Sequence, residues 1–131
     1  MKNKNWLAAA TFLAGLAVIL GAFGAHGLKT LVSPQQVETF KTGVQYQFYH
    51  SLAITLAVII SQFVDSPTVK RSFGLFAVGI LLFSGSLYGL TFAEVTGSVG
   101  LRWLGPVTPL GGIFFVLGWL NLTIGIYRTK V

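Results

Sequence analysis

The segment Gln45-Tyr46-Gln47-Phe48-Tyr49-His50-Ser51 runs directly into Leu52-Ala53-Ile54-Thr55-Leu56-Ala57-Val58-Ile59-Ile60. The first part is the densest run of polar and aromatic side chains in the chain, and the second part is uncharged and mostly apolar. Polar residues at the start of such an apolar segment must lie at a membrane surface or form part of a buried site. The uncharged window around it, residues 42–64, is long enough for a membrane-spanning helix, which needs about 20 residues.

The composition extends this interpretation to the whole chain. Of 131 residues, 53% are hydrophobic and only 9% are charged, whereas a soluble domain carries about 25% charged residues. The charges leave four uncharged windows, at residues 5–28, 42–64, 72–93 and 103–127. No pattern of alternating strands accompanies them, so helices are favoured over a barrel. We therefore predict an all-α fold, a four-transmembrane-helix bundle forming a single integral membrane domain over residues 1–131, with spans at about 6–25, 45–63, 72–92 and 109–127.

The basic residues predict the orientation of this bundle. Six of the nine lysines and arginines lie in the two termini and the 65–71 loop, and three lie in the other two loops. We therefore predict a multi-pass protein of the cell (plasma or inner) membrane. By the positive-inside rule, both of its termini should face the cytoplasm. Basic residues against anionic membrane lipids explain the net charge of +6, so no nucleic-acid partner is expected.

The residues before the second span predict a short helix of their own. Ser33 is suited to capping a helix that starts at Pro34, and Gln36 stands where it would complete a capping box. Apolar residues then follow at helical spacing, at Val37, Phe40, Val44 and Phe48. We predict a short amphipathic helix over residues 34–44, lying at the outer interface. The alternative is that this segment is a lid over a site.

Small residues predict which helix faces are packed. In the first span, Ala8, Gly15 and Ala22 repeat every seven residues, and Ala17, Gly21 and Ala25 every four. Small residues allow helices to approach closely in lipid, so the first span is expected in the interior of the bundle. Glycines repeat every seven residues in the last span too, at Gly111, Gly118 and Gly125, and predict a second packed face.

The predicted topology brings polar residues from all four spans to the outer half of the bundle. In the second span, Gln47, Ser51 and Thr55 share one face, which should point inward because polar groups facing lipid are costly. The resulting candidates for a binding site or a hydrogen-bonded cluster are His26, Gln47, His50, Ser51, Ser84, Tyr88 and Thr108.

These candidates allow three classes of function. The first is a non-enzymatic protein that binds membrane lipids, a second copy or another membrane protein and supports envelope integrity. The second is a transporter or channel subunit that uses His50 and the Gln47/Ser51 face, although no span carries a carboxylate. The third is an enzyme, for which no catalytic constellation is evident. Two histidines and no cysteine make a poor metal site, so we expect neither a metal nor a cofactor and favour the first class.

Four motifs in this order resemble those of a known family. They are Gly21-Ala22-Phe23-Gly24-Ala25-His26-Gly27-Leu28, Gln45-Tyr46-Gln47-Phe48-Tyr49-His50-Ser51-Leu52, Phe83-Ser84-Gly85-Ser86-Leu87-Tyr88, and Pro106-Val107-Thr108-Pro109-Leu110-Gly111-Gly112 with Gly118-Trp119. The chain is similar over essentially its whole length to the domain-of-unknown-function family number 423, whose members include YgdD- and YwdK-like proteins. The resemblance implies a four-span membrane protein of bacterial envelopes, and it implies no reaction and no catalytic residue.

Overall fold

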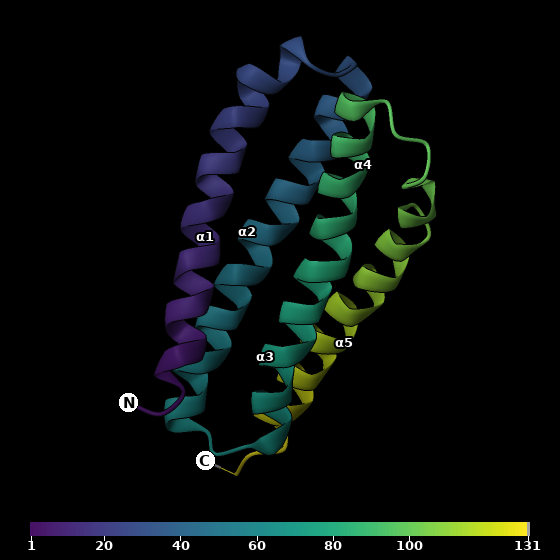
Figure 1. Cartoon of the computed structure of the whole chain (residues 1–131). Coiled ribbons are helices and arrows are strands. Elements are labelled where there is room, and N and C mark those ends of the chain that lie inside the picture. Colours follow the sequence, from purple (N-terminus) through teal and green to yellow (C-terminus); the bar gives the residue numbers. More distant parts are fainter. Residues whose placement is uncertain (131) are drawn as a thin grey trace.

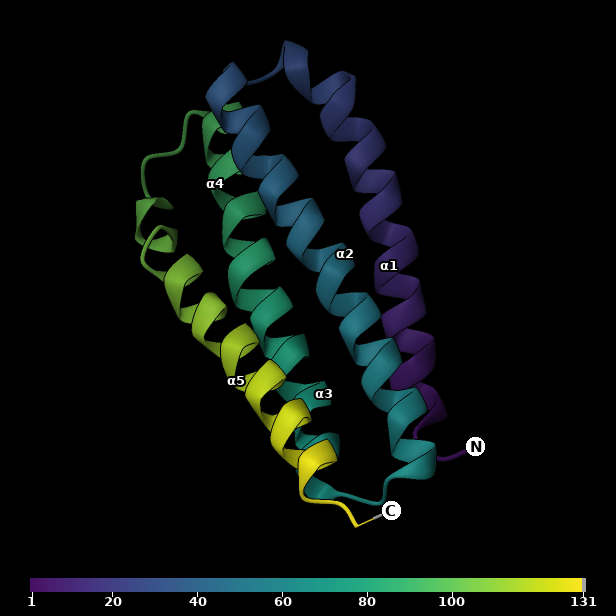
Figure 2. The ribbon, with the colours of Figure 1, turned by 180° about the vertical axis from the view of Figure 1, so that it is seen from behind.

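The structure is a computed structural model that describes residues 1–130 as a bundle of long helices joined by short turns (Figure 1, and from behind in Figure 2). The helices are α1 (Lys4–Ala25), α2 (Pro34–Phe63), α3 (Pro67–Gly79), α4 (Gly85–Thr96) and α5 (Val107–Tyr127), with short turns at η1 (Gly27–Thr30), η2 (Ile80–Ser84) and η3 (Arg102–Leu104). Helices α1 and α3–α4 run one way and α2 and α5 run back, so the chain begins and α5 ends at the same end of the bundle (Figure 1). The prediction of an all-α fold is confirmed for these residues.

Helix α2 is the longest element, with 30 residues, or about 45 Å at the helical rise. Ser33 caps it as predicted, accepting a hydrogen bond from the Gln36 main-chain N–H at 3.2 Å. Residues 34–44 are helical as predicted, but they form the first part of α2 and not a separate helix. No proline interrupts the helix after Pro34, so its hydrogen bonding runs on unbroken.

The start of α2 is also tied to α4, in a way that the capping-box pattern did not predict. Gln36 does not complete the box, because its Nε2 donates to Thr91 Oγ1 at 2.8 Å. Glu94 supplies the missing acceptor: its Oε1 lies 3.3 Å from the main-chain nitrogen of Ser33. A carboxylate is favourable at the N-terminus of a helix because of the helix dipole. Two helices distant in sequence are thus joined at this end of the bundle.

Helices α3 and α4 form one continuous helical stretch, Pro67–Thr96, interrupted by a π-helical turn at Ile80–Ser84. The stretch begins after a tight turn in which Ser66 caps the helix and Lys70 Nζ lies 2.6 Å from Asp65 Oδ1. This hydrogen bond and the positive charge of Lys70 lower the pKa of Asp65. π-Helical turns are rare and change the register of side chains along a helix, and this one ends at the buried Ser84.

The glycine face predicted for the last span is confirmed. Gly111, Gly118 and Gly125 are all buried along α5. A methyl group at Gly118 would lie 2.6 Å from the Phe76 ring, and one at Gly125 would lie 2.8 Å from the main-chain nitrogen of Val69. The absent side chains therefore allow α5 to lie directly against α3.

The prediction that the first span lies inside the bundle is wrong. Helix α1 lies at the edge and packs mainly against α2 (Figures 1 and 2). Ala10, Ala17 and Gly24 are buried, whereas Ala8, Gly15 and Ala22 are exposed. A heptad repeat of small residues shows that close packing is possible on a face, but does not show that a partner within the same chain fills it.

Three helical stretches of the described residues are long and apolar enough to cross a membrane: Lys4–Thr30, Pro67–Thr96 and Arg102–Tyr127. Helix α2 is not among them, although it is long enough. Polar residues such as Gln47 and His50 occur in its central part, where a spanning helix is usually most apolar. The chain is thus a multi-pass membrane protein by these three stretches, and the part played by α2 depends on where its polar residues point.

Candidate functional site

Gln47 connects three helices at the centre of the bundle. It is 3% exposed, and both the nitrogen and the oxygen of its side-chain amide form hydrogen bonds. The Nε2 donates to the main-chain carbonyl of Leu13 on α1 at 2.8 Å, and the Oε1 accepts from the Tyr88 hydroxyl on α4 at 2.7 Å. The inward direction predicted for the Gln47 face is confirmed. Its amide binds helices on both sides, so it holds α1 and α4 to α2.

His50, one turn further along α2, lies in an aromatic environment. Its ring stacks on Phe115 of α5, with ring centres 3.5 Å apart and planes 9° from parallel. Its Nδ1 lies 2.8 Å from the carbonyl of Tyr46, and its Nε2 accepts from the indole N–H of Trp119 at 3.2 Å. A carbonyl only accepts and an indole N–H only donates. The proton of the neutral imidazole is thus assigned to Nδ1, and both ring nitrogens are engaged.

The predicted serines and Thr108 make separate contacts. Ser84, which is fully buried, donates to the Gly43 carbonyl at 2.6 Å and joins the π-helical turn to α2. Ser51 is also fully buried but bonds to the carbonyl of Gln47 in its own helix, at 2.6 Å. Thr108 does not meet the other candidates: its hydroxyl lies 2.6 Å from Ser86 and joins α5 to α4.

His26 is placed apart from this cluster. It lies exposed just after α1, with its Nδ1 2.9 Å from the Ala22 carbonyl. Ser86, Phe115 and Trp119 contact other predicted residues but were not predicted as members of the site. Phe115 and Trp119 occur in an apolar segment, where an aromatic residue that faces the bundle cannot be told from one that faces lipid by its sequence context. Only their direction in the folded bundle distinguishes them.

We use the name polar cluster for Gln47, His50, Ser51, Ser84 and Tyr88 with their bonded partners. Within residues 1–130, no buried side-chain nitrogen or oxygen lacks a hydrogen-bond partner. Nor do three or more metal-ligating side chains of these residues gather at one place. Every group of the polar cluster is therefore engaged with another helix or with its own backbone. The arrangement can hold helices together, and a ligand could enter only by displacing these bonds.

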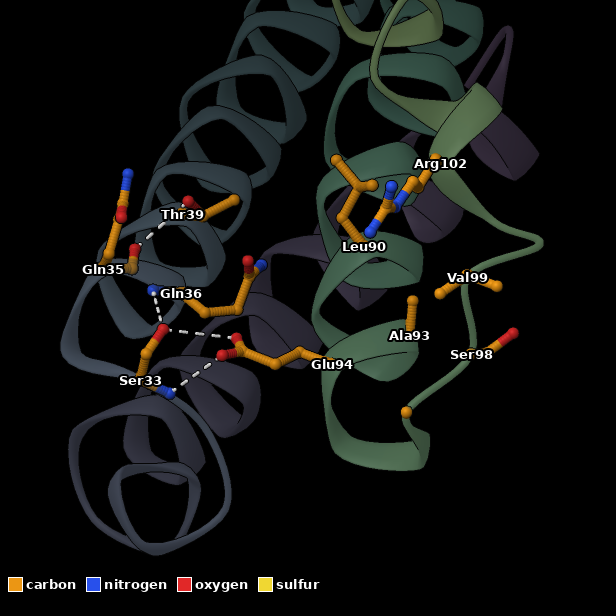
Figure 3. Close-up of a pocket in the computed structure, with 11 residues that line it drawn as sticks. Ser33, Gln35, Gln36, Thr39, Leu90, Ala93, Glu94, Ser98, Val99 and Arg102 are labelled. Carbon is orange, nitrogen blue, oxygen red and sulfur yellow. Dashed lines mark hydrogen bonds between the residues drawn. The ribbon is translucent and has the colours of Figure 1, made fainter.

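A second candidate region is an open cleft of about 600 Å³ (Figure 3). The start of α2 and the end of α4, which line it, lie at the end of the bundle away from the N-terminus (Figure 1). The start of α2 forms one wall, the end of α4 lies in the middle, and the 97–102 loop forms the other wall (Figure 3). Glu94 points toward Ser33 and bonds to it, while Arg102 enters from the loop side near Leu90 (Figure 3). Because Glu94 is already bonded to Ser33, the cleft offers chiefly amides, hydroxyls and one guanidinium.

The bond between Gln47 and Tyr88 gives a direct test of the polar cluster. We expect Gln47→Leu and Tyr88→Phe each to destabilise the fold, and the double variant to lose less than their sum. The expected coupling is about 1 kcal/mol, within the range measured for hydrogen bonds in membrane proteins. Unfolding of the four proteins in mild detergent measures it.

Gln45→Leu is the control for this cycle, because Gln45 is exposed on the same helix. It should leave the unfolding midpoint nearly unchanged. Additive effects of Gln47→Leu and Tyr88→Phe would show that the 2.7 Å contact between them contributes nothing to stability.

Comparison with known proteins gives the family of the chain. The family described as "Protein of unknown function (DUF423)" matches residues 20–112. The chain is 38% identical over 130 residues to a UPF0382 membrane protein of Haemophilus influenzae, covering 99% of this chain and 98% of the relative. It is 38% identical over 114 residues to the UPF0382 membrane protein YwdK of Bacillus subtilis, covering 86% of this chain and 88% of the relative.

A third relative extends the comparison to a protein named for its membrane. The UPF0382 inner membrane protein YgdD of Escherichia coli is 35% identical over 130 residues, covering 99% of this chain and 95% of the relative. No solved structure matches the chain. The resemblance inferred from the four motifs is confirmed, and the chain belongs to the DUF423 family of membrane proteins, whose function is not known.

Proposed function

We propose that the chain is a non-enzymatic, four-span protein of the bacterial inner membrane that binds membrane lipids or a protein partner and supports envelope integrity. The observation that carries this proposal is the complete internal bonding of the polar cluster, in which Gln47 and His50 each use both of their polar side-chain atoms. A catalytic group or a proton carrier needs a free atom that can reach its substrate. Side chains used up in helix contacts fit a scaffold whose outer surface does the binding.

The proposal counts α2 as the fourth span. Its polar residues Gln47, His50 and Ser51 are buried, and α2 packs between α1 on one side and α3–α4 on the other (Figure 1). A helix in that position needs less apolar surface than one that faces lipid, because its polar groups bond to neighbouring helices. This accounts for the low hydropathy of α2. The antiparallel course of α2 between α1 and α3–α4 (Figure 1) supports its assignment as a span.

The orientation and the partner surface follow from charges and exposure. The larger number of lysines and arginines at the termini and the 65–71 loop supports a cytoplasmic position for that end of the bundle. The exposed track of Ala8, Gly15 and Ala22 on α1 is suited to a second copy or another membrane helix, because small residues permit close approach. The proposal includes neither a cofactor nor a nucleic-acid partner.

Native mass spectrometry of the protein extracted with its lipids tests this function. We expect the wild-type protein to retain a lipid adduct or to appear as a dimer, because binding takes place at its surface. A Gln47→Ala, His50→Ala pair should lower the unfolding midpoint and still show the adduct while folded. Reconstituted into liposomes, the protein should show no flux of ions or small solutes above that of empty liposomes.

Two outcomes would count against the proposal. A substrate-dependent flux that is lost in the His50→Ala variant would favour a transporter using the polar cluster. Release of the adduct in the cluster variant at an unchanged unfolding midpoint would place the binding site in the cluster, and the scaffold assignment would be withdrawn.

A further inference from the structure

One face of α2 carries two neighbouring hollows that the polar cluster does not use. The first, of about 260 Å³, is lined by Lys29, Pro34, Val37, Glu38 and Lys41. The second, also of about 260 Å³, is lined by Ala17, Val18, Gly21, Val44, Gln45, Phe48 and Tyr49. The α2 residues of both hollows follow one another at spacings of three and four along the helix. They therefore share a face, and the hollows lie one above the other along it.

The second hollow is an apolar groove between α1 and α2. Small residues of α1 create it: Ala17 has only a methyl group, and Gly21 has no side chain where Val44 of α2 approaches. Val18 and Tyr49 border it and are 63% and 53% exposed, so it opens to the surroundings of the bundle. In a spanning bundle this surface faces hydrocarbon, and an acyl chain is the apolar group available there.

The first hollow is a basic pocket next to the end of this groove. Lys29 comes from η1 and Lys41 from α2, and both lie where the chain leaves the apolar part of the bundle. Lys41 is held in place by Glu38, with Nζ 3.1 Å from the Glu38 carboxylate, and its side chain is 40% exposed. Two ammonium groups and one carboxylate leave the pocket with a positive charge. An anion is the ligand that this charge attracts.

The spacing between the two hollows fits a single molecule. Gln45 lies one helical turn below Lys41, and Phe48 lies seven residues below it, about 10 Å along the helix axis. The exposed amide of Gln45 thus lies between the charged pocket and the apolar groove. A phospholipid has the same order of groups: a charged phosphate, polar ester carbonyls and then acyl chains.

Resting on the proposed function of lipid binding, we infer that the α1–α2 face binds one phospholipid with a net negative headgroup. Its phosphate lies between Lys29 and Lys41, and an acyl chain follows the groove lined by Ala17, Gly21 and Phe48. The α1–α2 groove gives a role to Ala17 and Gly21, two of the small residues of α1. Gly21 keeps the groove open, and Lys41, positioned by Glu38, selects the headgroup charge.

A lipid-competition experiment on the full chain tests the inference. The purified protein is given equal amounts of phosphatidylglycerol and phosphatidylcholine with the same acyl chains, and native mass spectrometry compares the first bound lipid. We expect phosphatidylglycerol to be preferred at least fivefold, since each basic residue near an anionic headgroup strengthens binding by about that factor. The Lys29→Gln, Lys41→Gln pair should bind both lipids equally.

Substitutions in the groove test the acyl-chain position. Gly21→Leu and Val18→Trp should each reduce occupancy by both lipids, because the larger side chains fill the groove. Ile19→Trp is the matched control, since Ile19 is 67% exposed on the same helix and does not line the groove. Lys4→Gln is the control for general attraction between lysine and anionic lipid. Circular dichroism and the unfolding midpoint identify any variant that fails to fold, and Val18→Trp then replaces Gly21→Leu.

The outcomes separate this inference from the proposed function. If the wild-type protein retains phosphatidylglycerol and the double lysine variant prefers it just as strongly, the site is overturned while lipid binding stays in place. Undiminished occupancy in both groove variants would overturn the acyl-chain position in the same way. Absence of any bound lipid on the wild-type protein would overturn both the site and lipid binding as the function.

Discussion

Replacing Gly111 by alanine is expected to lower the free energy of unfolding by about 3 kcal/mol, the upper part of the range for overpacking a well-packed interface. The added methyl group would lie 2.7 Å from the Cα of Phe83 and closer still to its main-chain nitrogen. A side chain could rotate away, but main-chain atoms can yield only if the helix moves. Phe83 lies in the π-helical turn Ile80–Ser84, so α5 would have to separate from this turn.

The neighbouring glycine supplies the control for this prediction. A methyl group at Gly112 would meet the Phe83 ring at 4.0 Å, which is an ordinary contact, and alanine favours a helix over glycine. Gly112→Ala should therefore leave stability unchanged or raise it slightly. Chemical or thermal unfolding in detergent measures both variants. Equal effects of the two substitutions would show that α5 does not approach the π-helical turn as closely as the structure describes.

Replacing His50 by alanine is expected to cost about 3 kcal/mol of stability, as for other large buried side chains. His50 is 5% exposed and its ring contacts rings from two other helices, most closely Phe115 at 3.5 Å between centres. Truncation leaves a cavity beside Phe115 and removes the acceptor of the Trp119 indole. The loss should appear as a lower unfolding midpoint with an unchanged helix content at low temperature.

A second substitution separates the two contributions of His50. His50→Phe keeps an aromatic ring against Phe115 and removes the hydrogen bond to Trp119, so it should cost about 1 kcal/mol. Tyr49→Ala is the control on the adjacent, half-exposed position and should have an effect of less than about 1 kcal/mol. If His50→Phe were as harmful as His50→Ala, the hydrogen bond to Trp119 would be the main contribution and stacking a minor one.

The candidate site shows how far the sequence could be read. Gln47 and Ser51 were predicted to face inward, because polar side chains in an apolar helix are costly when they face lipid. Ser84 was predicted to belong to the same cluster. Their partners were not predicted. Gln47 donates a hydrogen bond to the main-chain carbonyl of Leu13 on α1. Every residue carries such a carbonyl, so the sequence does not indicate which one is the partner.

The aromatic partners of His50 were likewise not predictable from the sequence. Trp119 and His50 are 69 positions apart, and Phe115 is one of 11 phenylalanines in the chain. Each lies in an apolar helix where an outward and an inward ring look alike in the sequence. The choice between them is made by the packing of α5 against α3, which the glycines of α5 set.

The all-α class, the approximate positions of the long helical segments, the cap at Ser33 and the family could be predicted from the amino-acid sequence. These features depend on composition, on local hydrogen bonding and on charges near each segment, all of which are encoded along the chain. Three features became visible only in the folded bundle: α2 is unbroken from Pro34, α1 lies at the edge of the bundle, and Glu94 bonds to Ser33. These features depend on which helices become neighbours, and a periodic face indicates that a helix can pack without specifying what packs against it.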